Sequence, residues 1–261
     1  MKADNFFLAV LLASTTGLFA STAARAQATI DQNKALAGSV TPGDGPGFPV
    51  TLSVPGSYKL TGNLVVPAGP SGIVVTATGV TLDLNGFNIG GPITCSRNGA
   101  TASVTCSAPT ATNYGVEFTT GGNVVRNGSV RGFSTGVRFL GADLLENLLV
   151  EQNFSSGVQS PSFVGARTLI RGVRVQLNGG HGMVVSATLV QGSTSAANGG
   201  HGLYGGRTVV YDSVSVDNKG AGFTGNNIVV GRTQSEGNKG GNYVSTVSAG
   251  NNVDGTSSVP F

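Results

Sequence analysis

The sequence is poor in charged residues, in histidine and in cysteine. Asp, Glu, Lys and Arg account for 10% of its 261 residues, whereas about a quarter is usual for a globular domain. The few basic residues are spread along the chain, so no basic stripe suits nucleic acid. A Cys/His metal site lacks a matching pair of further ligands beside the two cysteines, and the two histidines alone lack a third ligand. We therefore expect no nucleic acid partner, no structural metal and no cofactor.

Long hydrophobic runs are also scarce, because only one occurs, near the N-terminus. Lys2 precedes an apolar run from Phe6 to Ala20, and two small-x-small patterns then end at Ala26 and Ala28. This arrangement predicts a secretory signal peptide over residues 1–28, since the run is too short to span a membrane. No later segment is long and apolar enough to do so. We expect an exported protein, periplasmic or secreted, without a membrane span.

Glycine, in contrast, is abundant, and the chain repeats itself. The 42 glycines disfavour helices, while the many Val, Leu and Ile residues argue against disorder. Apolar pairs recur at steps of 20, 25, 20, 20 and 20, at Val124-Val125, Leu144-Leu145, Leu169-Ile170, Leu189-Val190, Val209-Val210 and Val229-Val230. A second column has steps of 21, 21, 25, 20, 20 and 20, at Val116, Val137, Val158, Met183, Leu203, Phe223 and Tyr243. The insertion "SPSFV" lengthens the same repeat in both columns, which therefore share one period.

This period predicts an all-β parallel solenoid. Each unit of 20–25 residues holds short β-branched runs bounded by Gly and Asn, which are typical of strands. Such a unit cannot bury its own apolar face, whereas stacked copies can, with their strands about 4.8 Å apart. We count roughly nine coils from Tyr58 to Val247. A further column of asparagines stands at the bends, where asparagine tolerates the left-handed conformation: Asn153, Asn178, Asn198, Asn218 and Asn238.

The remaining segments do not follow the repeat. We expect four parts: a signal peptide at 1–28, an irregular capping segment at 29–57, a single β-helix at 58–247 and a polar tail at 248–261. Within the capping segment, Ile30–Ala37 is expected to form a short helix over the end of the rod.

An excursion at residues 93–113 interrupts the β-helix. It contains the two cysteines, Cys95 and Cys106, eleven positions apart. In an exported chain, an intramolecular disulfide between them is the natural expectation. We therefore predict a loop outside the repeat that is closed by its own disulfide.

Two stretches carry a resemblance to a known family. They are "GSYKLTGNLVVPAGPSGIVVTATGVTLDLNGFNI" at residues 56–89 and "VVRNGSVRGF" at residues 124–133. With these stretches, the sequence resembles the exported bacterial right-handed parallel β-helix repeat proteins of the pectate-lyase-like superfamily. That superfamily includes polysaccharide lyases, polygalacturonases, epimerases, phage tailspikes and adhesins. The resemblance implies a right-handed solenoid and covers nearly all of the chain after residue 28.

The motif "NGGHG" occurs twice and contains the two histidines, His181 and His201. Its Gly-His-Gly part is similar to a polygalacturonase motif. Those enzymes also use Asn-Thr-Asp and Asp-Asp motifs on neighbouring coils, and neither is present here. Glycoside hydrolysis needs two carboxylates, and a candidate base needs its partners within reach. We interpret the motif as a turn that recurs with the coils.

The acidic residues offer only weak catalytic candidates. Asp212 and Asp217 are expected on one coil with Glu236 on the next, and Asp143, Glu146 and Glu151 form a second loose group. A polysaccharide lyase would need clustered carboxylates to hold Ca²⁺, so calcium is expected only if the protein is a lyase. We interpret both groups as solvated acids at turns, which are common on a polar rim.

The column after each apolar pair offers a candidate ligand site. If the second member of each pair points inward, Arg171, Gln191 and Tyr211 form a continuous strip on the outside of neighbouring coils. A guanidinium, an amide and an aromatic ring suit the hydroxyls, carboxylates and apolar face of a sugar. If Leu189 points inward instead, the strip lies inside.

Three functions remain open. We favour an exported, non-catalytic β-helix protein that presents a face to a polysaccharide or a cell-surface component. The alternatives are a polysaccharide lyase or glycoside hydrolase with an atypical site, and a purely structural or adhesive module. A cleft flanked by two carboxylates, or by a carboxylate cluster and an arginine, would favour the enzyme.

Overall fold

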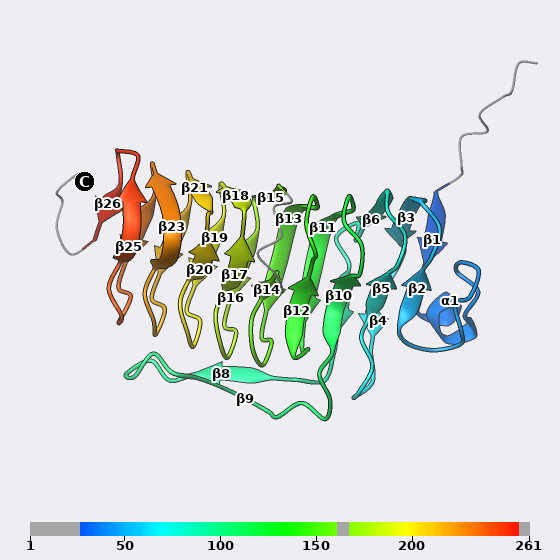
Figure 1. The fold of residues 1–261 in the computed structure, drawn as a ribbon. Coiled ribbons are helices and arrows are strands. Elements are labelled where there is room, and N and C mark those ends of the chain that lie inside the picture. Colours follow the sequence, from blue (N-terminus) through cyan, green and yellow to red (C-terminus); the bar gives the residue numbers. More distant parts are fainter. Residues whose placement is uncertain (1–26, 161–166, 256–261) are drawn as a thin grey trace, which may run out of the picture.

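The protein is a rod of stacked coils. The computed structural model describes residues 27–160 and 167–255 (Figure 1). The predicted signal peptide lies outside the described residues except for its last two positions, as does the end of the polar tail. Each coil contributes up to three short strands, and strands of successive coils pair in parallel to form three faces, which we call A, B and C.

Along each coil the chain forms a strand of face C first, then one of face A and then one of face B. Face A consists of β1 (Ala28–Ile30), β3 (Gly56–Leu60), β6 (Val80–Asp83), the first half of β11 (Val124–Arg131), the first half of β13 (Leu144–Glu151), β15 (Thr168–Arg171), β18 (Thr188–Gln191), β21 (Val209–Tyr211), and the ends of β23 (Phe223–Gly231) and β25 (Tyr243–Ser248). Face B consists of β4 (Leu64–Val65), β7 (Asn88–Gly90), the second halves of β11 and β13, β16 (Arg174–Gln176), β19 (Thr194–Ala196), β22 (Val214–Val216), β24 (Gln234–Glu236) and β26 (Val253–Asp254). Face C consists of β2 (Val50–Leu52), β5 (Ile73–Val75), β10 (Tyr114–Phe118), β12 (Thr135–Arg138), β14 (Val158–Gln159), β17 (Met183–Ser186), β20 (Leu203–Gly206), and the starts of β23 and β25.

The parallel β-solenoid predicted from the repeat is confirmed, with about ten turns. The nine coils counted from Tyr58 are present on face A, and β1 adds a tenth because Ala28 pairs with Tyr58. The pairing extends beyond both expected bounds of the β-helix. Strand β2 pairs with β5, and β26 pairs with β24, so the capping segment and the polar tail each contribute strands.

The N-terminal end of the rod carries the only helix of the described residues, α1 (Gln32–Ala37) (Figure 1). Asp31 caps it, because its carboxylate accepts the backbone N–H of Lys34 at 2.9 Å. The predicted helix at Ile30–Ala37 therefore starts two residues later, since Ile30 belongs to β1. No helix within the described ranges has the length and apolar character that a membrane crossing needs.

The core is a set of aliphatic and aromatic stacks that run along the rod. On face A the second member of each apolar pair is buried, as for Leu145, Ile170, Val190 and Val210. The first member faces outward, and Leu189 is 40% exposed. Strand alternation fixes this choice, because neighbouring residues of a strand point to opposite sides. The interpretation that would place Leu189 in the core is therefore wrong.

The asparagine column forms a buried ladder at the bend between faces B and C. The Nδ2 group of Asn178 donates to Oδ1 of Asn198 at 2.9 Å, and Asn198 donates to Asn218 in the same way. The expected left-handed conformation falls instead on the preceding residue, for example Leu177 and Ala197. Asn153, Asn178, Asn198 and Asn218 face inward. Oδ1 of Asn178, for example, accepts the backbone N–H of Asn153 on the preceding coil, and its Nδ2 donates to Asn198 on the next.

The excursion at residues 93–113 is an ordered hairpin of β8 (Cys95–Arg97) and β9 (Val104–Cys106). The predicted disulfide is confirmed, because Cys95 and Cys106 are bonded across the two strands. Figure 1 shows the hairpin running along the rod, across the bends of several coils. It contacts the rod far from its own coil, since Arg97 donates from Nη2 to the backbone oxygen of Asp217 at 3.0 Å.

Replacing Cys95 and Cys106 together by serine is expected to lower the free energy of unfolding by at most about 2–3 kcal/mol, because the closed loop is short. The hairpin should loosen, while the coils keep their own ladder of hydrogen bonds. Hydrogen exchange should therefore rise in residues 93–113 and stay unchanged in β15 to β22. An equal rise in both regions would contradict this prediction.

Candidate functional site

Face A presents a regular array of side chains where β15, β18 and β21 lie side by side. Their outward residues form an aliphatic column of Leu169, Leu189 and Val209, and beside it the predicted strip of Arg171, Gln191 and Tyr211. The bend before each strand adds a third column, Arg167, Ala187 and Arg207. We call these nine residues the face A array. The strip lies outside, because Ile170, Val190 and Val210 between the columns are buried.

A hollow of about 670 Å³ lies over this array. Its floor is the aliphatic column, and Tyr211 borders it on the strip side. Arg167 and Arg207 line it from the bends of the first and third coils, and the short side chain of Ala187 lies on the coil between them. Two coils correspond to about 10 Å along the rod. The hollow thus combines an aliphatic floor with two cationic groups.

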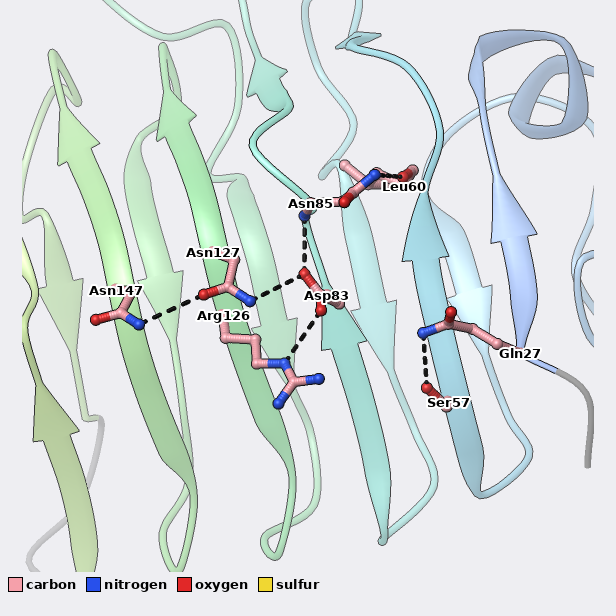
Figure 2. Close-up of polar contacts among 8 residues, drawn as sticks. All are labelled: Gln27, Ser57, Leu60, Asp83, Asn85, Arg126, Asn127 and Asn147. Carbon is pink, nitrogen blue, oxygen red and sulfur yellow. Dashed lines mark hydrogen bonds and ion pairs between the residues drawn. The ribbon is translucent and has the colours of Figure 1, made fainter. Parts of the chain in front are cut away.

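Charged residues of the strip column are paired with one another. Arg171 donates to Glu146 on the preceding coil, although its side chain remains 52% exposed. Figure 2 shows the same arrangement further along the column, where Arg126 and Asp83 are directed toward each other at 3.2 Å. Asp83 also accepts from Nδ2 of Asn127. Arg171 is therefore ion-paired with Glu146, and the rest of its side chain is exposed to solvent.

Tyr211 is held in place by a cation and a carboxylate. The Arg232 guanidinium lies over the Tyr211 ring, 5.1 Å from its centroid. Arg232 also donates to both carboxylate oxygens of Asp212, at 2.7 and 2.9 Å. The hydrogen bond from Arg232 lowers the pKa of Asp212. Asp212 is thus an oriented, ionised carboxylate and is unsuited to donate a proton to a leaving group.

The three weak catalytic candidates are not brought together. Asp212 lies at the bend before β22, whereas Asp217 lies at the bend after it. Glu236 is near Asp217, because the Asp217 N–H donates to the Glu236 carbonyl oxygen at 3.0 Å. Among the described residues, no group of three His, Cys, Asp or Glu side chains is placed to hold a metal ion.

The second acidic group also separates into individual contacts. Asp143 is not a solvated turn residue, because it is 2% exposed and accepts the N–H groups of Asn123 and Gly141. Burial raises the pKa of Asp143, and these hydrogen bonds oppose the rise. Glu146 pairs with Arg171, and Glu151 accepts from Gln176 at 2.7 Å. The interpretation of this group as solvated acids is wrong for Asp143.

Each residue of the "NGGHG" motif has a structural role. The asparagine belongs to the buried ladder. At the first glycine there is no room for a Cβ, which at Gly179 would lie 2.9 Å from Sγ of Cys106 in the hairpin. The second glycine leaves room for the histidine of the previous coil, since a Cβ at Gly200 would lie 2.6 Å from Nδ1 of His181. The motif is therefore a turn shaped by its neighbours along the rod.

The histidines form a stack at this turn. The rings of His181 and His201 are parallel, with centroids 5.0 Å apart. Nδ1 of His181 accepts the N–H of His201, and Nδ1 of His201 accepts the N–H of Ala221, at 2.9 and 2.8 Å. Both rings are thus neutral acceptors whose proton lies on Nε2, so neither offers a lone pair at Nε2 to a metal ion. Burial lowers the pKa of both imidazoles, and the neighbouring ring lowers that of His181 further.

This stack is expected to make the fold sensitive to mild acid. Because the folded-state pKa values lie below the ordinary value of 6.5, the unfolded chain binds more protons. The stabilising contribution is therefore complete above pH 6.5 and is lost as the pH falls through the folded-state values. We expect the Tm of the wild type to fall between pH 7 and 5.5, and the Tm of a variant with His181→Gln and His201→Gln to fall less. Parallel profiles of Tm against pH would contradict this expectation.

Sequence reasoning missed the partners of the candidate residues, although a signal for them exists. Arg232 stands twenty positions after Asp212, which is one repeat. Glu146 and Arg171 are likewise one repeat apart once the insertion is counted. Opposite charges at equivalent positions of successive coils lie about 4.8 Å apart, so they form ion pairs along the rod. Comparing charges by repeat position would have found both pairs.

Comparisons with known proteins identify the fold. No family model matches the sequence, and no curated protein matches it. Among solved structures, the enzymatically active domain of tailspike protein 2 of bacteriophage CBA120 has a TM-score of 0.60 at 13% identity, covering 78% of this chain and 37% of the tailspike domain. Pectate lyase Pel9A has a TM-score of 0.54 at 16% identity, covering 72% of this chain and 56% of the lyase.

These identities establish likeness of fold alone. The chain spans about a third to a half of the length of the two proteins. The resemblance found in the sequence is confirmed at this level, since both comparisons match a coiled rod of parallel strands. With its ten turns and three parallel faces, the chain has a parallel β-helix fold that is similar to those of this tailspike domain and this pectate lyase.

Proposed function

We propose that this protein is an exported, non-catalytic β-helix protein that binds a polysaccharide, or a cell-surface component that carries one, on face A. The observation that carries this proposal is the face A array, an exposed, in-register group of side chains over which a hollow lies. The stacking of coils repeats this group along the rod at about 4.8 Å. An extended polymer suits such a surface, because it can contact several coils at once.

The strip supplies the contacts that a sugar needs. Tyr211 offers an aromatic ring, and the Arg232 guanidinium above it restricts its motion. Gln191 is exposed and offers both an amide donor and an acceptor. Arg171 offers the exposed part of its guanidinium. Rings that pack on the apolar face of a sugar and planar groups that bind its hydroxyls are a common combination.

The acids near the array support binding without cleavage. Asp212 is engaged by Arg232, and Glu146 by Arg171. Asp217 follows β22, and Glu236 ends the neighbouring strand β24, so both lie at the edge of face B opposite to Asp212. A lyase or hydrolase needs a carboxylate cluster or a pair across the scissile bond, and the acids around the array are arranged differently. The disulfide suits an oxidising compartment, in agreement with export by the predicted signal peptide.

The test is a panel of polysaccharides scored for both binding and cleavage products. We expect one class to bind without release of products. Arg171→Ala and Tyr211→Ala should each weaken that binding several-fold and lower the Tm by only a few degrees, because both side chains lie outside the core. His201→Ala is the matched control, because its ring lies at the bend between faces B and C, and it should leave the affinity unchanged.

Two results would contradict the proposal. Full affinity in both strip variants would place the site elsewhere on the rod. Release of unsaturated or reducing ends by the wild type, abolished by Asp217→Asn or Glu236→Gln, would identify an enzyme instead.

A further inference from the structure

We infer that export removes residues 1–26, so that the mature protein begins at Gln27. The inference rests on the export part of the proposed function and adds the position of the proteolytic cut. Two small-x-small patterns, which end at Ala26 and at Ala28, make either position acceptable to a signal peptidase. The contacts of the residues that follow Ala26 distinguish the two products.

Ala28 belongs to the fold. It is the first residue of β1, pairs with Tyr58 of β3 and packs against the hydrophobic core. Because β1 has three residues, a cut after Ala28 would remove a third of the strand. The buried Tyr58 would then lose its partner in β1. A cut after Ala26 leaves the strand whole.

Gln27 makes a contact of its own with the next coil. Its Nε2 group donates to Oγ of Ser57 at 3.0 Å, as Figure 2 shows. A cut after Ala26 keeps this hydrogen bond and places the new α-ammonium group on Gln27. Gln27 is exposed, so water solvates the charge at little cost. A cut after Ala28 would remove the hydrogen bond together with the residue.

The charges around Thr29 disfavour the alternative terminus. Lys34 donates from Nζ to the carbonyl oxygen and to Oγ1 of Thr29, at 3.0 and 2.6 Å. Lys59 is the partner of Thr29 in β3. A cut after Ala28 would place an α-ammonium group on Thr29 beside these two cations, and like charges repel each other at such short range.

The acids beside these lysines are already engaged. Asp31 caps α1, because its carboxylate accepts the backbone N–H of Lys34 at 2.9 Å. Asp83 is the partner of Lys59 on the next coil, and it is paired with Arg126 (Figure 2). Neither carboxylate is a separate partner for a third cation at this place. The product that begins at Gln27 therefore keeps β1 complete and avoids the clustering of positive charge.

The cut is a hydrolysis of the peptide bond between Ala26 and Gln27. Water supplies the oxygen of the new Ala26 carboxylate and the protons of the new α-ammonium group. A terminal glutamine can then cyclise, because its amine attacks the carbon of its own side-chain amide and ammonia leaves. The open and the cyclised terminus result from the same cut.

The experiment exports the full chain from a bacterial host and measures the intact mass of the purified protein. We expect the mass of residues 27–261, with or without the loss of one ammonia molecule. A mass of residues 29–261 would overturn the inference and leave export in place. An uncut chain of 261 residues would overturn the inference together with the export on which it rests.

Two variants test which pattern is used. Ala24→Phe changes a small residue that only the first pattern contains, so the cut should move to the bond after Ala28. Ala28→Val is the matched control, because it changes only the second pattern and valine suits a strand. Its cut should stay after Ala26. If Ala28→Val blocks processing, the second pattern is the one in use and the inference is wrong.

The product of Ala24→Phe also tests the structural reason. Because this product begins at Thr29, hydrogen exchange in β3 should be about tenfold faster than in the wild type and unchanged in β15 to β22. Adding Lys59→Gln should slow that exchange again, since it removes one of the crowded cations. Equal exchange in β3 of the two products would overturn the inference that an intact β1 sets the boundary.

Discussion

Replacing Ile170 with alanine is expected to lower the free energy of unfolding by about 2–5 kcal/mol. Ile170 is fully buried and lies between Leu145 and Val190 in the inner stack of face A. The coils on either side are fixed to its own strand by backbone hydrogen bonds at a constant spacing. They cannot close in on the space that the lost methylenes leave, so most of the cavity should remain.

Leu189→Ala is the control for this prediction, because it removes a similar side chain from the outer surface of the same face. Its cost should stay near or below about 1 kcal/mol, since Leu189 already contacts water. Thermal unfolding and urea titration of both variants measure the difference. Equal losses would mean that the inward and outward assignments on face A are wrong.

Replacing Asn198 with alanine is expected to cost about 3 kcal/mol or more. Oδ1 of Asn198 accepts both the N–H and the Nδ2 group of Asn178, and its own Nδ2 donates to Asn218. Truncation leaves these groups without their partners in a fully buried position. Each buried polar group left unsatisfied costs about 1–3 kcal/mol.

Asn147→Ala is the matched control, because Asn147 also lies at a bend but is exposed. Its side chain makes one long contact, with Asn127 at 3.5 Å (Figure 2). We expect its Tm to stay within a few degrees of the wild type, while that of Asn198→Ala falls by about 6–12 °C for a chain of this size. If Asn198→Ala lowered the Tm only slightly, water molecules would have to replace the hydrogen bonds that the Asn198 side chain makes.

Much of the fold is predictable from the sequence because a solenoid is nearly one-dimensional. Each coil contacts mainly its neighbours, so a fixed repeat reports which residues stack. The pairs at Leu189-Val190 and Val209-Val210 gave the correct register, and that register is observed. The column of Arg171, Gln191 and Tyr211 followed from the same step. The ends were less predictable, because β1 and β26 pair without following the repeat.

The candidate site was only partly predictable. The strip could be placed, but the pairing of Arg171 with Glu146 and of Asp212 with Arg232 was not foreseen. The hollow was not foreseen either, because its shape depends on how Arg167 and Arg207 border the small Ala187. The weak catalytic acids were grouped by sequence distance, yet the strand β22 separates Asp212 from Asp217.

The sequence by itself determined the period, the stacking partners and the disulfide, because these depend on local spacing and residue type. Only the tertiary structure decided how the hairpin packs. Its strands pack across Gly179 and Gly199 and reach Asp217, which are contacts between segments far apart in the chain. Those contacts explain why glycine stands at positions 179 and 199. The histidine stack explains the next glycine of the turn, because a Cβ at Gly200 would lie against the ring of His181. No repeat step links the hairpin to these coils, so spacing alone carries no information about where it lies.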